Sequence, residues 1–443
     1  MVNSKSEFIK DLFNNLNSNH VDYFVLGEYN SLPLKIENSD LDIIVDPTDV
    51  ETFLKVLFNL ISQYNVKVVS NYTNSNAKFY RLLCESDNYW GLQLDLFCKG
   101  FYFQSKEYFP VNQLKKNVLL FNNIKVLDLK KTYFVGFLKE IIHNGCSKKK
   151  YINGFITEVL SDEIKYRKLL TELYSEEFTK IVFDNLSINS LKKKTKELRK
   201  IMLNKIYNGK SIFLKNTIER IKNAKRVFTP PGYTIVFLGE QSSRKRLITS
   251  IIPVLNEAFY NSVFYENSRP NYIYSNKKKA NKNNDIKELD SFSKSKKSFF
   301  FISSLFRYFD YTFGYWIKIF PKKAFNSCVW IFDGYYYDGI INPKKGRLAL
   351  PNWIVKIGAL LIPEPDLIIC LGQNTEFQNN QKTKSNAEDI YKQSYKLSKF
   401  CLQHKQAVWI SAESSLEQSV DSAMKFISEV MEKRFEVINQ NYN

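Results

Sequence analysis

The chain has 443 residues, and its 64 lysine and arginine residues against 45 aspartate and glutamate residues give a formal net charge of +19. At ~100–200 residues per domain, this length predicts two or three domains and excludes a small disulfide-stapled fold. The 27 tyrosines and 35 phenylalanines exclude global disorder, because disordered chains contain few aromatic residues.

The first 127 residues alternate between helical and strand patterns. Apolar residues repeat at helical spacing over 8–16, and an apolar run at 23–26 that ends at Gly27 predicts a short buried strand. Beyond it we expect a strand at 41–45, a helix from about 48 to 64, and strands at 66–69, 78–83 and 92–98. The pattern predicts a small α/β domain over residues 1–127.

Residues 128–228 predict a helical domain. Strand signals fade there, and apolar residues such as Phe134, Phe137 and Ile141 recur at helical spacing. The charged run KKKTKELRK at 192–200 is most often a solvated helix face. The helical pattern stops at the sequence TPPG of residues 229–232, because prolines and glycine in succession break a helix.

Residues 229–443 predict a second α/β domain, with a parallel sheet. An unbroken apolar run at 233–238, then a helix from about 243 to 259, is typical of the start of such a domain. The Lys, Asn and Ser-rich segment 267–297 predicts a mobile loop. Beyond it we expect helices at 299–320, 353–362, 387–405 and 416–434, and strands at 328–332, 367–371 and 407–410.

The six cysteines and three histidines are scattered, without the spacing of a zinc site or a disulfide framework. The first residues lack the apolar core of a signal peptide, and the most apolar stretch, 353–372, is interrupted by charged residues and prolines. We therefore expect no transmembrane segment and a cytoplasmic protein. Nothing in the sequence indicates an oligomeric state.

The positive charge suits phosphate-bearing partners. Lysine, asparagine, isoleucine, tyrosine and phenylalanine are abundant together, which an AT-rich coding sequence would produce whatever the function. We therefore expect nucleotides and a small-molecule acceptor as partners, rather than nucleic acid. A nucleic-acid-modifying transferase stays open, on the lysines of the loop at 277–297 alone.

Three aspartates form the first candidate site. Asp40 and Asp42 alternate along a predicted strand and therefore lie on one face, about 7 Å apart. Asp95 lies in a second apolar strand, where an uncompensated charge is costly. Because the nearest basic residue in sequence, Lys35, lies outside the strand, we expect the carboxylates to hold Mg²⁺. The plain alternative is a strand start with a turn aspartate.

This arrangement, with Gly27 thirteen residues before Asp40, resembles the nucleotidyltransferase superfamily over about 125 residues. The resemblance implies that Asp40, Asp42 and Asp95 are catalytic and hold two Mg²⁺ ions, and that Gly27 and Ser39 bind the nucleotide. One residue departs from the family. The serine that usually follows the glycine is Glu28, which removes a hydroxyl donor from the triphosphate and adds repulsion.

The segment from Gly239 to Arg246, with the sequence GEQSSRKR, occupies the place of a phosphate-binding loop, between a strand and a helix. Only Gly239 and Lys245 of the usual G-x-x-x-x-G-K-[ST] pattern remain. Arg244 stands in place of the second glycine and Arg246 in place of the hydroxyl that binds Mg²⁺. We expect Arg244 to distort the loop, while the helix N-terminus and the basic side chains could still hold an anion.

Later motifs, from LFRYFDY at 305–311 and FDGYYYD at 332–338 to PEPDLII at 363–369, recur in a recognisable order. Together they resemble the thymidylate-kinase-like domains fused behind a nucleotidyltransferase domain in proteins associated with bacterial surface-polysaccharide synthesis. The resemblance implies that the nucleotide-binding residues include Gly239, Lys245, Arg307, Asp333, Arg347 and Lys382. Gly334, Gln373 and Gln381 replace two arginines and a carboxylate of the family, so we expect this domain to be weak or inactive.

The resemblances imply an α/β protein with a nucleotidyltransferase-like domain, a helical middle and a kinase-like domain. The expected activity is Mg²⁺-dependent nucleotidyl transfer from a nucleoside triphosphate, with ATP as the expected donor, to a small sugar-related acceptor. Two alternatives stay open: a catalytically silent nucleotide-binding or assembly protein, and an active nucleotide or sugar kinase.

Overall fold

The computed structural model describes residues 4–36, 40–73, 77–85, 89–98, 100–103, 106–207, 224, 226–270, 309–341, 362–373 and 385–442. Most of the predicted loop at 267–297, much of the helix predicted at 299–320 and nearly all of the one at 353–362 lie outside these ranges. The chain divides into two compact units, Met1–Lys225 and Arg226–Asn441. The finer boundary at residue 127 stays a prediction.

The first unit contains a seven-stranded mixed sheet with the strand order β3-β4-β5-β2-β1-β9-β8. Its strands are β1 (Tyr23–Leu26), β2 (Leu41–Val45), β3 (Val66–Thr73), β4 (Ala77–Cys84), β5 (Trp90–Phe97), β8 (Val118–Phe121) and β9 (Ile124–Leu127). A separate hairpin is formed by β6 (Phe101–Phe103) and β7 (Lys106–Phe109). The central strands of the sheet are β1, β2 and β5. Asp42 lies in β2, Asp95 lies in β5, and Gly27 follows β1.

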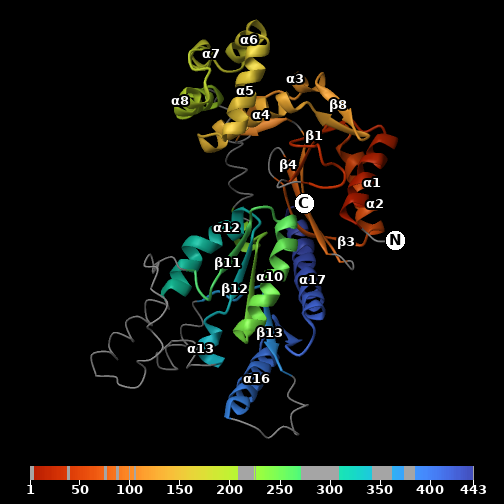
Figure 1. Ribbon diagram of the computed structural model, residues 1–443, viewed down its shortest axis with the longest axis vertical. Helices are drawn as coiled ribbons and strands as arrows, with labels where there is room; N and C mark the ends of the chain where they lie inside the picture. The colour runs from red at the N-terminus through yellow and green to blue at the C-terminus, as the bar shows by residue number, and fades with distance from the viewer. Residues whose placement is uncertain are drawn as a thin grey trace, which may run out of the picture. The chain divides into compact units, whose positions relative to one another are not determined.

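Helices α1 (Lys5–Ser18) and α2 (Val50–Gln63) pack against each other and against the sheet, as Figure 1 shows. Helix α1 begins at a capping box, in which the Ser4 hydroxyl accepts from the Glu7 backbone N–H and the Glu7 side chain accepts from that of Ser4. Its apolar residues, repeating at helical spacing from Phe8 to Leu16, are buried.

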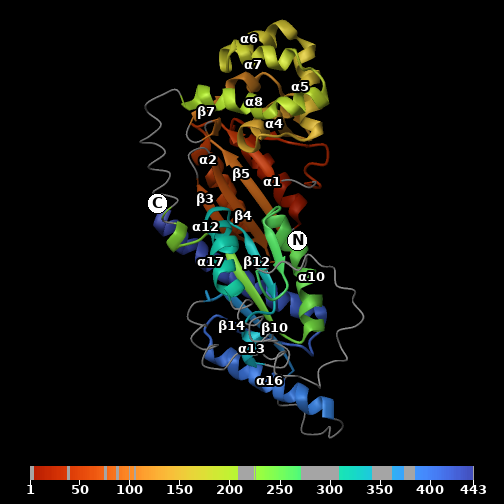
Figure 2. The ribbon, with the colours of Figure 1, turned by 90° about the vertical axis from the view of Figure 1, so that its left-hand side faces the viewer.

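A second group of helices packs together, with α5 and α8 directly against α4 (Figure 2). The group consists of α4 (Leu129–Asn144), α5 (Lys149–Ser161), α6 (Glu163–Leu173), α7 (Glu176–Phe183) and α8 (Ile188–Tyr207), and the short helix α3 (Asn112–Lys115) precedes β8. Phe134 and Phe137 of α4 share one hydrophobic core with Phe24 of β1 and Ile44 of β2. This core fixes α4 against the strands that carry the aspartates.

The second unit contains a five-stranded parallel sheet with the order β11-β12-β10-β13-β14. Its strands are β10 (Tyr233–Gly239), β11 (Val263–Glu266), β12 (Val329–Asp333), β13 (Leu367–Gly372) and β14 (Ala407–Ser411). β10, the first strand of this unit in sequence, lies at the centre of the sheet. The strands that follow it are added first on one side of β10 and then on the other. In parallel sheets, ligands bind outside the carboxyl ends of the strands at such a point.

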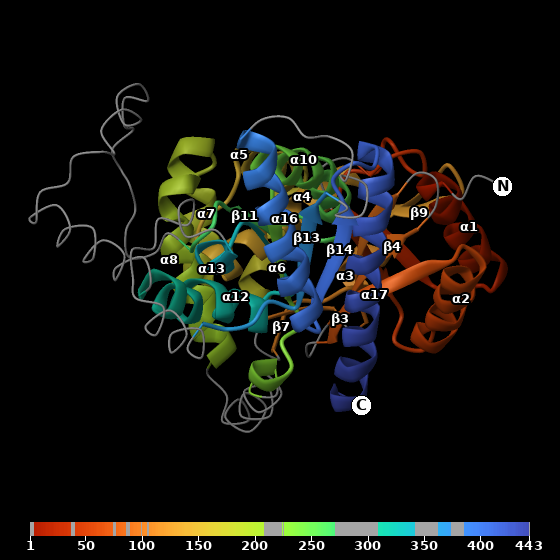
Figure 3. The same ribbon diagram turned by 90° about the horizontal axis from the view of Figure 1, so that it is seen from below.

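Helices cover both faces of this sheet, and Figure 3 shows α16 and α17 on opposite sides of β13 and β14. The described helical segments are α10 (Gln241–Ala258), the π-helical turn η1 (Tyr315–Ile319), α12 (Phe320–Phe325), α13 (Tyr337–Ile341), α16 (Ser385–Gln403) and α17 (Leu416–Tyr442). The predicted α/β class is therefore confirmed in both units. Within the described ranges, no helix is long and apolar enough for a membrane crossing.

Candidate functional site

The structure brings Asp40, Asp42 and Asp95 together. Strands β2 and β5 are parallel neighbours, and their register places Asp42 directly opposite Asp95. Asp40 lies just before β2, two residues from Asp42, and so points to the same face. One carboxylate oxygen from each of the three residues lies within 4.8 Å of the other two.

Three neighbours of this cluster were not predicted from the sequence. Arg81 of β4 forms an ion pair of 3.0 Å with Asp95, and Lys139 of α4 lies 3.5 Å from Asp42. The Gln93 amide donates to Asp40 at 3.0 Å. The sequence analysis considered only Lys35, the nearest basic residue in sequence, whereas the fold brings two cations to the cluster from distant positions in the sequence.

These cations do not satisfy the whole cluster. One oxygen of Asp42, Oδ1, is buried and has no hydrogen-bond partner among the described residues. Burial raises the pKa of Asp42 to about 8 despite the nearby Lys139, and raises the pKa of Asp95 to about 6 despite Arg81. A buried unpartnered oxygen is costly, so this position suits a ligand that offers positive charge.

The donor set fits Mg²⁺, which prefers carboxylate oxygens and keeps several waters. Oxygens that bind one Mg²⁺ at about 2.1 Å lie at most about 4.2 Å apart. The separation of up to 4.8 Å therefore closes with small side-chain rotations. Asp42 Oδ1 offers a lone pair that no described residue uses.

Gly27, predicted to bind nucleotide, lies beside this cluster. It follows β1, whose last residue, Leu26, pairs with Asp42. Its φ of +101° favours glycine, and a Cβ built there would meet no atom within 4 Å. The space beside the aspartates is therefore open at Gly27. Ser39, the other predicted nucleotide-binding residue of this domain, lies outside the described residues.

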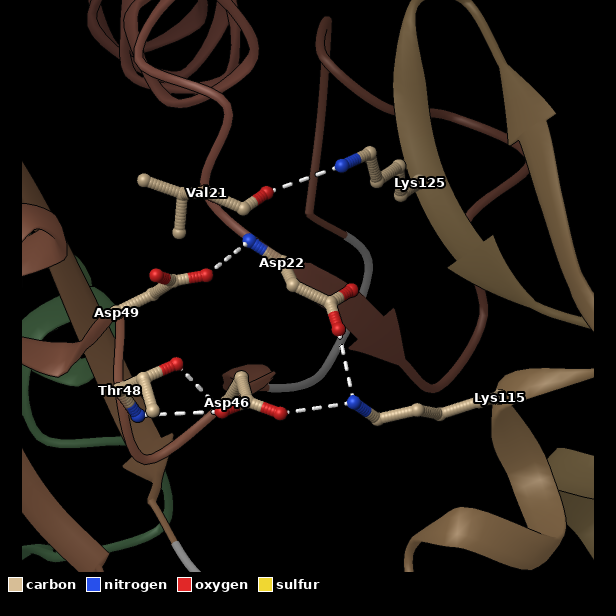
Figure 4. Close-up of polar contacts among 7 residues, drawn as sticks. All are labelled: Val21, Asp22, Asp46, Thr48, Asp49, Lys115 and Lys125. Atoms are coloured by element: carbon tan, nitrogen blue, oxygen red, sulfur yellow. Dashed lines mark hydrogen bonds and ion pairs between the residues drawn. The ribbon is translucent and has the colours of Figure 1, made fainter.

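A cavity of about 430 Å³ lies at the other end of β1 and β2, near Asp22 and Asp46. Lys115 donates to both of these carboxylates, at 2.8 Å each, and Thr48 also donates to Asp46 (Figure 4). These hydrogen bonds lower the pKa of Asp46 to about 2. The aspartates of the cavity are therefore already satisfied, in contrast to Asp42, and we do not place the chemistry there.

The second candidate site lies at the carboxyl end of β10. This strand ends at Gly239 and α10 begins at Gln241, two residues earlier than predicted, so a single residue, Glu240, connects them. A phosphate-binding loop needs several residues to wrap an anion. The carboxylate of Glu240 places a negative charge at the helix N-terminus, where it accepts a hydrogen bond from the Ser242 hydroxyl. Lys245 is exposed on the helix.

Arg244 is buried and points to the carboxyl end of β12 rather than distorting a loop. Its Nε lies 2.9 Å from Asp333 Oδ1, and its Nη1 lies 3.2 Å from Asp338 Oδ2. Asp333 also accepts from the Tyr265 hydroxyl at 3.0 Å. Asp333, predicted to bind nucleotide, therefore binds a side chain of its own unit. Three predicted nucleotide-binding residues lie outside the described ranges: Arg307, Arg347 and Lys382.

Solved structures that this chain resembles weakly include a kinase and a proposed nucleotidyltransferase. A thymidylate kinase from Ehrlichia chaffeensis matches 44% of this chain and 98% of its own, at 14% identity and a TM-score of 0.31. A proposed nucleotidyltransferase from H. pylori matches 46% of this chain and 94% of its own, at 10% identity and a TM-score of 0.22. At these scores the likenesses do not define an activity. No family model matches the chain, and no curated protein does.

Proposed function

We propose that the first unit transfers a nucleotidyl group from a nucleoside triphosphate, ATP being the expected donor, to a small sugar-related acceptor. One observation carries this proposal: the carboxylates of Asp40, Asp42 and Asp95 converge, and Asp42 Oδ1 is buried with no hydrogen-bond partner among the residues that the structure describes. Asp40, Asp42 and Asp95 are the residues that would hold Mg²⁺, which would neutralise phosphate oxygens and acidify the attacking hydroxyl. The cytoplasm stays the expected location.

The reaction is a displacement at the α-phosphorus. The acceptor hydroxyl gives up its proton to solvent and its oxygen forms a bond to this phosphorus, while the bond to the bridging oxygen breaks and pyrophosphate leaves with the electron pair. In this assignment Asp40 and Asp42 position the nucleotide, and Asp95 lies on the side of the attacking hydroxyl. Arg81 holds one oxygen of Asp95 at 3.0 Å, which fixes the orientation of that carboxylate.

A catalytically silent assembly protein is the second candidate, and two observations favour it. Arg81 and Lys139 already lie against two of the three carboxylates. In the second unit, Arg244 already pairs with Asp333, where the kinase resemblance places a nucleotide-binding residue. We propose that the second unit is a degenerate kinase-like domain without phosphoryl transfer.

The position of a radioactive label separates these functions. The full chain is incubated with Mg²⁺, a mixture of sugar phosphates and small metabolites, and each nucleoside triphosphate, labelled at the α- or the γ-phosphate. Nucleotidyl transfer moves only the α-label to an acceptor, and Asp42→Asn abolishes it while Asp46→Asn does not. Transfer of the γ-label would instead indicate a kinase, and no transfer with any triphosphate would favour the silent protein.

A further inference from the structure

Glu28, the residue that departs from the nucleotidyltransferase pattern, forms an ion pair with a helix far along the chain. Its Oε1 lies 2.8 Å from Nζ of Lys150, in the first turn of α5. Both side chains are about half exposed. Exposed ion pairs contribute only about 0–1 kcal/mol to stability, so stability does not account for this pair.

The pair lies next to the aspartate cluster. Glu28 is two residues beyond Leu26, which pairs with Asp42 across β1 and β2. The charges that act on Tyr151, the neighbour of Lys150, also indicate that this part of α5 lies near the aspartate cluster. Burial raises the pKa of this tyrosine, and among the charges that act on it are those of Lys150, Lys139 and Asp42.

Helices α4 and α5 approach each other closely at this point. A Cβ built on Gly136 of α4 would lie 2.6 Å from the ring of Tyr151, so only glycine allows this packing. Lys139 follows Gly136 by about one helical turn on α4 and lies 3.5 Å from Asp42. Lys150 is therefore presented from a helix that is packed tightly against the one that contacts the cluster.

The chemistry of the pair suits a triphosphate. An ammonium group has three N–H donors and a carboxylate has none to offer an anion. Glu28 accepts from Lys150, which leaves donors on Lys150 for phosphate oxygens. The pair is neutral overall, so it also cancels the repulsion that an isolated Glu28 would exert on the nucleotide.

We propose that Lys150, oriented by Glu28, binds the β- and γ-phosphate oxygens of the donor triphosphate and replaces the hydroxyl that the serine would supply at position 28. This inference rests on the proposed nucleotidyl transfer, and it assigns to the helical region a direct part in nucleotide binding. Lys150 is a nucleotide-binding residue in this account, and Glu28 is a positioning residue.

Equilibrium binding of ATP and of AMP to the full chain, with Mg²⁺ present, tests the assignment. Lys150→Gln should weaken ATP binding at least tenfold and AMP binding less than twofold, because AMP lacks the β- and γ-phosphates. Lys150→Arg should stay within about threefold of the unchanged protein. Lys149→Gln, which removes an exposed lysine one residue away, is the matched control and should leave ATP binding within twofold.

The double variant Glu28→Ser with Lys150→Gln tests whether position 28 faces the phosphates of the nucleotide. It restores the hydroxyl and removes the unpaired carboxylate, so it should bind ATP more tightly than Lys150→Gln alone. Equal effects of Lys150→Gln and Lys149→Gln on ATP, or equal losses for ATP and AMP, would overturn the assignment of Lys150.

Asp42→Asn separates this inference from the function on which it rests. If Asp42→Asn removes the Mg²⁺ dependence of ATP binding while Lys150→Gln behaves like its control, only the role of Lys150 is wrong. If ATP binding shows no Mg²⁺ dependence in the unchanged protein, or keeps it in Asp42→Asn, the proposed function itself fails.

Discussion

Asp42 and Asp46 lie four residues apart, at the start and just beyond the end of one short strand, yet their surroundings differ in kind. Asp46 accepts from Lys115 and Thr48, and its pKa falls to about 2. Oδ1 of Asp42 is buried and has no hydrogen-bond partner within the described ranges, and the pKa of Asp42 rises to about 8. One carboxylate stabilises the fold by being charged, whereas the other is costly when charged and suits a bound cation.

This difference predicts opposite effects of pH on two variants. The folded pKa of Asp42 exceeds its unfolded value of 3.8, so its contribution to stability falls as pH rises from about 4 to about 8. In EDTA, Asp42→Asn should therefore exceed the unchanged protein in Tm by more at pH 8 than at pH 5, because the charged carboxylate is present in the folded protein only at the higher pH. Thermal unfolding at a series of pH values measures this difference.

Asp46→Asn, just beyond the end of the same strand, is the control. The folded pKa of Asp46 is depressed, so the stabilising contribution of this carboxylate is present above pH 3.8 and is lost as pH falls through about 2. This variant should lower Tm at pH 7 and have less effect near pH 2. A lower Tm for Asp42→Asn at pH 8, as large as that for Asp46→Asn at pH 7, would contradict the account of Asp42.

Two glycines with positive φ should respond differently to alanine. At Gly239, with φ of +118°, a Cβ would lie 2.0 Å from the backbone oxygen of Leu371. At Gly27, with φ of +101°, a Cβ would meet nothing. Gly27→Ala should cost about 1–2 kcal/mol for the backbone conformation alone, whereas Gly239→Ala adds a clash and should cost well above 3 kcal/mol. Urea unfolding of the two variants tests this order.

At the scale of the element, the position at which α10 begins determines where the basic residues 244–246 lie. The helix begins immediately after Glu240, and Arg244 turns inward to Asp333 and Asp338. The basic run at 244–246 therefore does not form one anion-binding surface. Arg244 is buried in an ion-pair cluster, and Lys245 and Arg246 are exposed.

Removing Arg244 should destabilise the second unit without creating a nucleotide site. Arg244→Met leaves Asp333, whose side chain is 2% exposed, without its cation, which should cost about 3–5 kcal/mol. Arg246→Met, on the exposed face, should change stability by less than about 0.5 kcal/mol. Thermal unfolding measures both.

The second unit should not bind ATP in an Mg²⁺-dependent way. In a chain that carries Asp42→Asn, so that the first site is silent, ATP binding should not tighten with Mg²⁺. Adding Arg244→Gly with Arg246→Ser should recover little phosphorylation of thymidine monophosphate, because the connection at Glu240 stays too short. Micromolar, Mg²⁺-dependent binding with phosphorylation in the Asp42→Asn chain would show that the second unit is an active kinase.

The sequence predicted the long elements and missed those that depend on distant pairing. Strands such as β10 are continuous apolar runs, and α1 has a clear helical repeat, so local pattern was sufficient. The hairpin of β6 and β7 has strands of three and four residues, too short for a reliable period.

Of the candidate site, the sequence predicted the aspartates but not the cations that lie against them. The aspartates could be found because alternation places Asp40 and Asp42 on one face and because Asp95 is a charge in an apolar strand. Arg81 could not be assigned to Asp95, because that contact depends on the register of β4 against β5. The contact of Lys139 with Asp42 depends on how α4 packs on the sheet, and no local sequence pattern predicts that packing.

At the scale of the whole molecule, the chain consists of two compact units, each with its own sheet and its own buried core. The aspartate cluster, Lys139 and Lys150 all belong to the first unit. The proposed chemistry therefore needs no described residue beyond 225.

A fragment of residues 1–225 should accordingly fold and keep the response to metal. Its Tm should rise with Mg²⁺ and ATP by an amount similar to that of the corresponding transition in the full chain. The same fragment with Asp42→Asn should show no such rise. A fragment that folds but does not respond, while the full chain does, would show that the site requires the second unit.

The most direct test of the central claim is a titration of the full chain with Mn²⁺, in the presence of a non-hydrolysable ATP analogue, followed by electron paramagnetic resonance. Mn²⁺ takes the same oxygen ligands as Mg²⁺ and loses its free signal when bound. We expect the unchanged protein and Asp46→Asn to bind Mn²⁺, and Asp42→Asn to bind it at least tenfold more weakly. Equal binding by all three proteins, or no binding by any, would contradict the assignment of Asp40, Asp42 and Asp95 as a metal site.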